Sequence, residues 1–337
     1  MSCDWLPDAL LSVADRLARA DQCAYEIAGL ISSWSLAGPL EMEQVWVDKE
    51  AQTYEVRISG VRPAPPMVAL LFSEGIHHVR ATLDNVVWYL TEQVMGSISD
   101  RQARQVQMPI YDDVARYRQW VERVVKNGLD CFDDSATLGQ RILSLQPFKD
   151  THQSVESFGQ LLGELTGAPR DLQHPLSLLQ GYSNADKHRH VRLAMARSTA
   201  FSFDRPFFDQ DRVHRPLEVG DVLASGVWGK PNPLETNTAA TIQRPGLDGV
   251  WVNPSRELGA LRQYVADVAI PVLILGLELS HGVPPEVDLS DRGATDRERI
   301  SSAGNRDFAE RFAPRLTEMW QSALEAGYHW PEPPRDA

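Results

Sequence analysis

The feature that most constrains the fold is a change of hydrophobic periodicity after Arg189. Segments before it share apolar residues at helical spacing: 5–34, 67–95, 112–128, 135–148, 154–167 and 174–189. From 191 to 253 the chain shows short alternating or β-branched runs separated by Gly, Pro and Asn, which are typical of antiparallel strands. Helical spacing returns in 254–280 and 306–327. The sequence therefore predicts an α+β fold that is mainly α, a helical bundle with an inserted small antiparallel β-sheet.

Residues 43–59 interrupt the helical half of the chain. The runs "EQVWVD" and "TYEVRIS" surround "KEAQ" and predict a short hairpin of two alternating strands. We expect one domain over residues 1–337, made of a helical core 1–190, a β-rich insertion 191–253 and C-terminal helices 254–328. The helix at 254–280 should kink at Pro271, and 283–299 should form a charged, exposed loop.

Composition limits the environment and the partners of the chain. A hydrophobic fraction of 43% and a charged fraction of 23% are ordinary for a folded soluble protein. The net charge of −13 argues against broad attachment to nucleic acid or to an anionic membrane, although it leaves room for a small basic pocket. The most apolar segment, Val265–Leu279, is too short to span a bilayer. We expect a cytoplasmic protein without membrane contact, and homo-oligomerisation is left open.

The three cysteines, Cys3, Cys23 and Cys131, are widely spaced and form no CxxC pair. Neither a disulfide framework nor a zinc knuckle is indicated, so free thiols in a reducing compartment are expected.

A first polar cluster lies on the helix predicted at 67–95. With 100° per residue, His77, Arg80 and Asp84 share a narrow arc at the edge of the apolar stripe, whereas His78 points elsewhere and is expected at the surface. A groove between packed helices would lie along this edge. The simplest interpretation is an Arg80–Asp84 ion pair along one helix.

A second polar cluster follows in "GYSNADKHRHVRLA". Asn184, Lys187 and His188 share one helical face, and Asp186 and Arg189 fall on the other, with apolar residues. An acid on an apolar face needs a partner, because an unpaired buried carboxylate is costly. Either Arg189 or Arg80 could serve, and we expect the two helices to pack with a charged group of one within hydrogen-bond reach of the other.

Several well-known catalytic motifs are missing. The sequence has no GxxxxGK[ST], no strand–GxGxxG–helix, no GxSxG and no HExxH. A metal site would have to use residues of the two polar clusters and their flank: His77, Asp84, Asp186, His188 or His190. Interleaved cations at Arg80, Lys187 and Arg189 would repel a metal ion. We therefore predict no metal and no cofactor.

Four stretches, "HHVRATLDNVVWYL", "MPIY", "LQPF" and "HPLSLLQGYSNADKHR", occur in this order. They resemble a large, poorly characterised bacterial family with an H-x-x-R-x-x-L-D helix, an F-P-I-like turn, a Q-P-Y-like element and an N-x-D-K-H-R motif. The resemblance covers residues 40–195. It implies that the marked positions are His77, Arg80, Leu83, Asp84, Asn184, Asp186, Lys187, His188 and Arg189. It implies no activity.

The helical layout is also similar to HEPN domains, which are helical nucleases and nucleic-acid-associated modules of toxin and defence systems. Their active motif is an Arg and a following His with four to six residues between them. The nearest match in this chain is Arg170 with His174, which has only three residues between and lies outside the marked cluster.

Three functions fit the clusters. In the first, a metal-independent, ribonuclease-like hydrolase cleaves a phosphodiester or nucleotide, with His77, His188, Asp84 and Asp186 as catalytic acid–base and orienting groups. Its phosphate-binding residues would be Arg80, Asn184, Lys187 and Arg189. In the second, the same cluster binds an anionic small molecule, a nucleic acid or a partner chain without chemistry. In the third, it is a buried polar network that fixes helix register.

Overall fold

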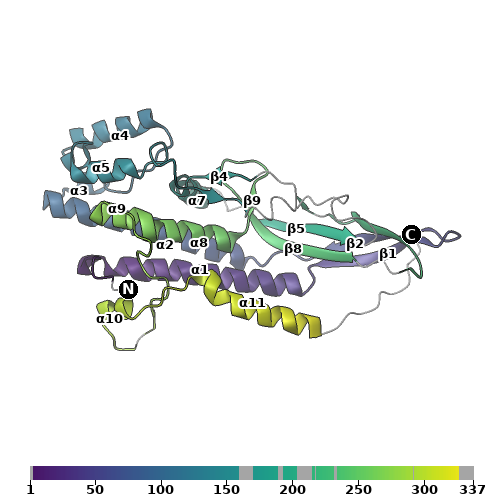
Figure 1. Ribbon diagram of the computed structural model, residues 1–337. Helices are drawn as coiled ribbons and strands as arrows, with labels where there is room; N and C mark the ends of the chain where they lie inside the picture. Colours follow the sequence, from purple (N-terminus) through teal and green to yellow (C-terminus); the bar gives the residue numbers. More distant parts are fainter. Residues whose placement is uncertain are drawn as a thin grey trace.

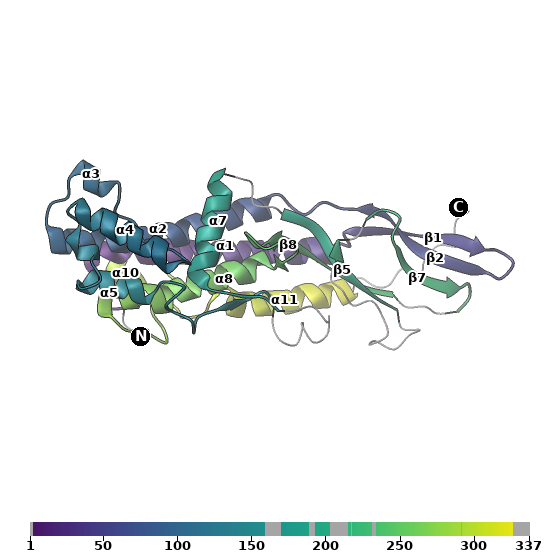
Figure 2. The same ribbon diagram turned by 90° about the horizontal axis from the view of Figure 1, so that it is seen from above.

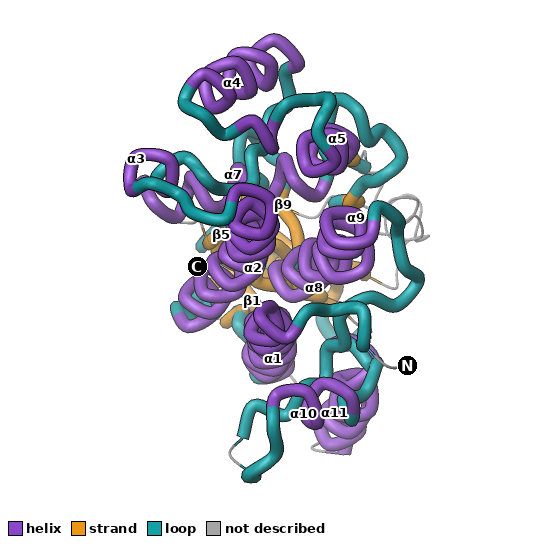
Figure 3. Tube along the Cα trace, turned by 90° about the vertical axis from the view of Figure 1, so that its left-hand side faces the viewer, coloured by secondary structure: helices purple, strands orange, loops and turns teal. Residues whose placement is uncertain are grey.

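The computed structural model describes residues 3–158, 170–188, 193–202, 215–216, 218–230, 234–290 and 292–325. Its frame is a bundle of α1 (Leu11–Leu36), α2 (Met67–Met95) and α8 (Pro254–Tyr264), whose axes run along the long dimension of the molecule (Figure 1). The same bundle is seen end-on in Figure 3. α11 (Phe308–Glu325) packs along α1. One cluster of buried apolar residues extends through these helices from Cys3 to Phe312.

The long helices begin and end where local chemistry directs. α2 follows Pro66 and ends at Gly96, which has a positive φ of 74°. α8 starts with Pro254 in its first turn, and the side chain of Asn253 accepts the N–H of Arg256. Close packing of the two helices depends on Gly75, because a Cβ there would lie 2.4 Å from Leu258 Cδ2.

Shorter helices surround the bundle. Their bounds are η1 (Asp8–Leu10), α3 (Asp100–Ala103), α4 (Val114–Lys126), η2 (Asp130–Phe132), α5 (Thr137–Ser144), α7 (Pro175–His188) and α10 (Asp296–Ser301). α3, α4 and α5 gather at one end of the bundle, and α7 crosses the bundle steeply near its middle (Figure 2).

All strand pairs of the described chain are antiparallel. One sheet contains β1 (Leu40–Asp48), β2 (Thr53–Val61) and β7 (Val222–Val227); the other contains β6 (Arg215–Pro216), β5 (Leu193–Ser202), β8 (Leu234–Gln243) and β9 (Trp251–Val252); a short ribbon contains β3 (Val155–Glu156) and β4 (Leu172–Gln173). The two larger sheets lie toward the end of the molecule opposite α4 (Figures 1 and 2). The predicted fold class, mainly α with small antiparallel sheets, is confirmed. The hairpin, however, pairs with β7 in a sheet separate from β5 and β8.

The segment 254–280 does not simply kink at Pro271. α8 passes through a π-helical turn, η4 (Val265–Ala269), into α9 (Ile270–Leu275). Pro271 has no N–H to donate to the carbonyl of Asp267, four residues earlier, and the N–H of Leu279 takes that carbonyl instead at 2.9 Å. The missing donor therefore folds the following loop back onto the helix.

The prediction of an exposed loop at 283–299 is wrong in part. Val283 and Val287 are buried in the core, and the end of the segment enters α10. Thr295 and Glu298 form a capping box that starts this helix. Two valines four residues apart were enough to anchor the first part of a segment whose composition is otherwise charged.

One described helical run, Pro254–Leu275, is long and apolar enough to cross a membrane. Of its most apolar window, 61% is buried inside the molecule, as expected for the core helix of a soluble protein. The three cysteines are free and buried.

Candidate functional site

α2 and α7 pack against each other, as the two polar clusters predict. Arg80 Nη1 donates to Gln180 Oε1 at 3.0 Å, and Gln180 Nε2 donates to Asn184 Oδ1 at 3.0 Å. The rings of Phe72 and Tyr182 meet edge to face beside this chain, with centroids 4.9 Å apart. A charged group of the first motif thus reaches the second helix, through a glutamine that the sequence reasoning did not single out.

Arg80 and Asp84 together hold the backbone of Met108. Arg80 Nη2 donates to the Met108 carbonyl at 2.6 Å, and Asp84 Oδ1 accepts the Met108 N–H at 2.9 Å. The two side chains also form an ion pair at 3.3 Å, with exposed fractions of 11% and 33%. Both terminal nitrogens of Arg80 therefore donate to protein acceptors.

Gln146, from the stretch "LQPF", holds two further residues of the same loop, Pro109 and Tyr111. Its Oε1 accepts the N–H of Tyr111 at 3.1 Å, and its Nε2 donates to the carbonyl of Pro109 at 2.9 Å and to that of Ile142 at 3.0 Å. The glutamine is fully buried. Side chains from α2 and from the turn after α5 thus hold backbone groups of Met108, Pro109 and Tyr111 in "MPIY".

The four stretches that carry the family resemblance meet at this place. The helix with Arg80 and Asp84, the "MPIY" loop, Gln146 and the helix with Gln180 are joined by direct hydrogen bonds. No family model, curated protein or solved structure matches the chain. The chemistry of the site is therefore inferred from its own geometry.

The two neighbouring histidines of α2 are placed differently from each other. His77 is exposed, whereas His78 is only partly exposed, in contrast to the expected surface position. α1 packs on that side of α2, where Arg19 donates to Glu74 at 2.7 Å and His78 Nε2 lies 3.8 Å from the same carboxylate. Burial lowers the pKa of His78, with the positive charge of Arg16 acting in the same direction.

The second motif is described only in part. Asn184 is exposed. Asp186, Lys187 and His188 belong to the last turn of α7, and their side chains lie outside the described residues, as do Arg189 and His190. Within the described part of the chain, no group of three or more His, Cys, Asp or Glu residues is placed to hold a metal ion. The roles expected for these five residues stay predictions.

The Arg170–His174 pair does not converge on one site. Arg170 pairs with Glu156 at 3.1 Å, on the surface. His174 is buried, with Nε2 3.4 Å from Asp150 Oδ2 and Nδ1 accepting the N–H of Leu176 at 3.2 Å. Both ring nitrogens therefore have protein partners, and Nδ1 accepts a backbone N–H in the first turn of α7.

A buried ion-pair network lies under α7 and was not found from the sequence. Arg244, 1% exposed, donates to both oxygens of Glu257 at 2.9 Å and to Asp171 at 2.9 Å. Its Nη2 also reaches the carbonyl of Val155 at 3.2 Å, and the Tyr182 hydroxyl donates to Glu257 at 3.0 Å. Burial raises the pKa of Glu257, and the Arg244 guanidinium opposes this. Every group is satisfied, which is typical of a structural network.

Proposed function

We propose that the protein is a non-catalytic cytoplasmic binding protein, in which α2 and Gln146 form a rigid frame and the outer face of α7 binds an anionic ligand. The observation that carries this proposal is that Arg80 and Asp84 both hydrogen-bond to the backbone of Met108. An arginine that recognises phosphate presents free N–H groups in a fork. The terminal nitrogens of Arg80 are engaged by Gln180, Met108 and Asp84, so this arginine supports the frame rather than the ligand.

The ligand-facing side begins at Asn184. Its Oδ1 accepts from Gln180, and its amide N–H groups bind no described residue. Lys187 shares the helical face expected for Asn184, and Arg189 follows directly after the end of α7. An exposed amide donor followed by two cations is a combination suited to a phosphate or carboxylate group. The ligand class is therefore an anionic small molecule or a nucleic acid strand.

Acid–base hydrolysis is the second candidate. The exposed imidazole of His77 lies three residues before Arg80 on α2. In this proposal His77 or His188 transfers protons to a phosphodiester held by the α7 cations.

The first experiment measures the fluorescence anisotropy of a labelled single-stranded RNA and of a labelled nucleotide. Lys187→Gln with Arg189→Gln should weaken binding by about tenfold or more. The matched control is Arg123→Gln with Lys126→Gln on the exposed face of α4, which removes the same charge elsewhere. Equal weakening by both pairs of substitutions would show that only the net charge matters and would contradict the proposal. An absence of binding by the wild type would also contradict it.

The same mixtures distinguish binding from hydrolysis. If the second candidate holds, product accumulates with or without chelator, and His188→Ala lowers turnover by about 10²-fold or more with an unchanged melting curve. Binding without any product, in all variants, supports the first candidate.

A further inference from the structure

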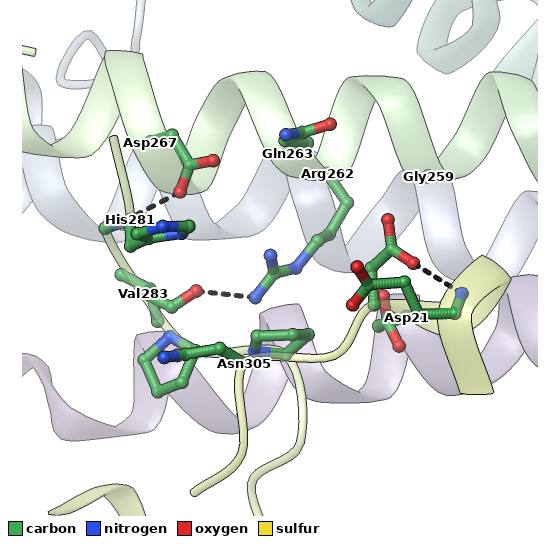
Figure 4. Close-up of a pocket in the computed structure, with 13 residues that line it drawn as sticks. Asp21, Gly259, Arg262, Gln263, Asp267, His281, Val283 and Asn305 are labelled. Carbon is green, nitrogen blue, oxygen red and sulfur yellow. Dashed lines mark hydrogen bonds between the residues drawn. The ribbon is translucent and has the colours of Figure 1, made fainter. Parts of the chain in front are cut away.

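A pocket of about 140 Å³ opens beside the π-helical turn η4, away from the α2–α7 cluster. It lies between α1, α8, the loop after α9 and the start of α11, as Figure 4 shows. Its polar lining consists mainly of Asp21, Arg262, Asp267, His281, Asn305 and Asp307.

The π-helical turn builds one wall of this pocket. It leaves the carbonyl of Ala266 to accept the N–H of Val283 at 3.2 Å, and Asp267 Oδ1 accepts the N–H of Gly282 at 2.8 Å. A Cβ on Gly282 would lie 1.9 Å from the Ala266 oxygen, so only glycine allows this approach. The loop is thus held against the helix by main-chain contacts, and the Asp267 carboxylate faces the pocket.

Arg262 forms the buried floor. It is 4% exposed, and its Nη2 donates to the Val283 carbonyl at 2.7 Å. Its Nε is buried and has no hydrogen-bond partner among the described residues, and the guanidinium reaches into the pocket (Figure 4). Burial lowers the pKa of Arg262, and Asp21 is the largest opposing influence. An unpaired donor in a buried guanidinium calls for an acceptor from a ligand.

The acidic residues of the pocket exceed its cations. Asp21 already accepts the N–H of Phe308 at 3.2 Å and pairs with Arg311. Asp267 and Asp307 are partly exposed and line the pocket, and the exposed Glu310 adds a further carboxylate to the lining. These carboxylates favour a ligand that places a positively charged hydrogen-bond donor in the pocket, above Arg262.

We propose that this pocket binds a small α-amino acid as a zwitterion, with its carboxylate accepting from the Arg262 guanidinium and its ammonium group held by the acidic residues of the lining, Asp267 and Asp307. The incompletely bonded guanidinium matches the carboxylate of such a ligand. The excess of carboxylates in the lining matches its ammonium group. The volume agrees, because a cavity of about 150 Å³ holds a ligand of about six non-hydrogen atoms, and glycine, alanine and serine have about five to seven. This site is independent of the function proposed for α7.

Isothermal titration calorimetry of the full chain tests the ligand class. Alanine should bind with a Kd below about 1 mM, whereas acetate and ethylamine, each with half of the charges, should bind about tenfold or more weakly. Ethylamine or putrescine binding as well as alanine would show a cation site and overturn the zwitterion. No saturable heat with glycine, alanine or serine would overturn the pocket altogether.

Two variants test the placement. Asp267→Asn keeps the shape of the side chain and should weaken alanine binding by about tenfold or more. Asp307→Asn serves if the first variant does not fold, since Asp307 caps α11 by accepting the N–H of Glu310, and asparagine caps equally well. The matched control is Asp113→Asn, which caps α4 in the same manner outside the pocket. Alanine affinity that is the same in the Asp307→Asn variant and in the control would contradict the proposal.

Discussion

Arg244 and Arg262 are both buried, but their surroundings differ. Arg244 has a bidentate carboxylate, a second acid and a main-chain carbonyl as partners. Arg262 has one main-chain carbonyl and an unpaired Nε beside an open pocket. A buried charge is tolerated where its hydrogen bonds are complete, and it is costly where they are not. The comparison therefore separates a residue that stabilises the fold from one that is available to a ligand.

Arg80 belongs with Arg244 in this comparison. Its partners are the backbone of Met108, the amide of Gln180 and the carboxylate of Asp84. Arg80 and Asp84 of the H-x-x-R-x-x-L-D helix thus have a structural explanation in this chain, while the pocket at Arg262 lies outside all four marked stretches.

The largest effect is expected from breaking the Arg244 network. Glu257→Gln removes the buried bidentate anion of Arg244, leaving only the partly exposed Asp171, and should lower the free energy of unfolding by about 3–5 kcal/mol. Arg292→Gln removes half of an exposed ion pair, 2.8 Å from Asp288, and should change it by less than about 1 kcal/mol. Denaturant unfolding followed by circular dichroism measures both. Similar losses in the two variants would remove the distinction between complete buried networks and surface pairs.

A smaller loss is expected where a neutral side chain holds the "MPIY" loop. Gln146→Leu keeps the apolar volume but strands the N–H of Tyr111 and the carbonyl of Pro109, which should cost about 1–3 kcal/mol. The amide of Tyr111 should also exchange its hydrogen faster. Gln119→Leu, on the exposed face of α4, is the control and should change neither quantity. An unchanged exchange rate at Tyr111 in the Gln146 variant would show that other contacts hold the loop.

The smallest expected effect is a pH dependence of the free energy of unfolding, which comes from the buried imidazole of His174. Burial lowers the pKa of His174 below its usual 6.5, with Asp150 opposing. The unfolded chain then binds more protons than the folded one, so stability is present above about pH 6.5 and is lost as the pH falls, by at most about 1.4 kcal/mol per unit.

Unfolding curves between pH 7.5 and pH 5 measure this slope, for which His174→Gln should give a flatter profile than the wild type. His152→Gln, at an exposed position, should keep the wild-type profile. If His174→Gln keeps the wild-type slope instead, the histidine is not a source of the pH dependence.

The fold follows from the sequence to a large extent. Periodicity predicts α2 at its observed bounds, because Pro66 precedes it and Gly96 ends it. The hairpin and the strands after Arg189 are predicted by alternation alone. Their division into two sheets is not, because strand pairing depends on contacts between distant segments, such as β2 with β7.

The site follows less well. The arc of Arg80 and Asp84 is correctly placed beside α7, but their partner is the backbone of Met108, and no side-chain pattern encodes a main-chain partner. Arg244 lies in the turn after β8 and Glu257 lies on α8, so no common period links them. The pocket at Arg262 depends on the π-helical turn before Pro271, which the sequence marks only by the proline.

The most direct test of the central comparison is denaturant unfolding of Arg244→Met beside Arg262→Met. The first should lose about 3–5 kcal/mol, because Glu257 and Asp171 are left without their cation. The second should lose less, about 1–2 kcal/mol, because only the Val283 carbonyl is left without its donor and the cost of burying the charge is recovered. Equal losses in the two variants would contradict the assignment of Arg244 to the fold and of Arg262 to a ligand.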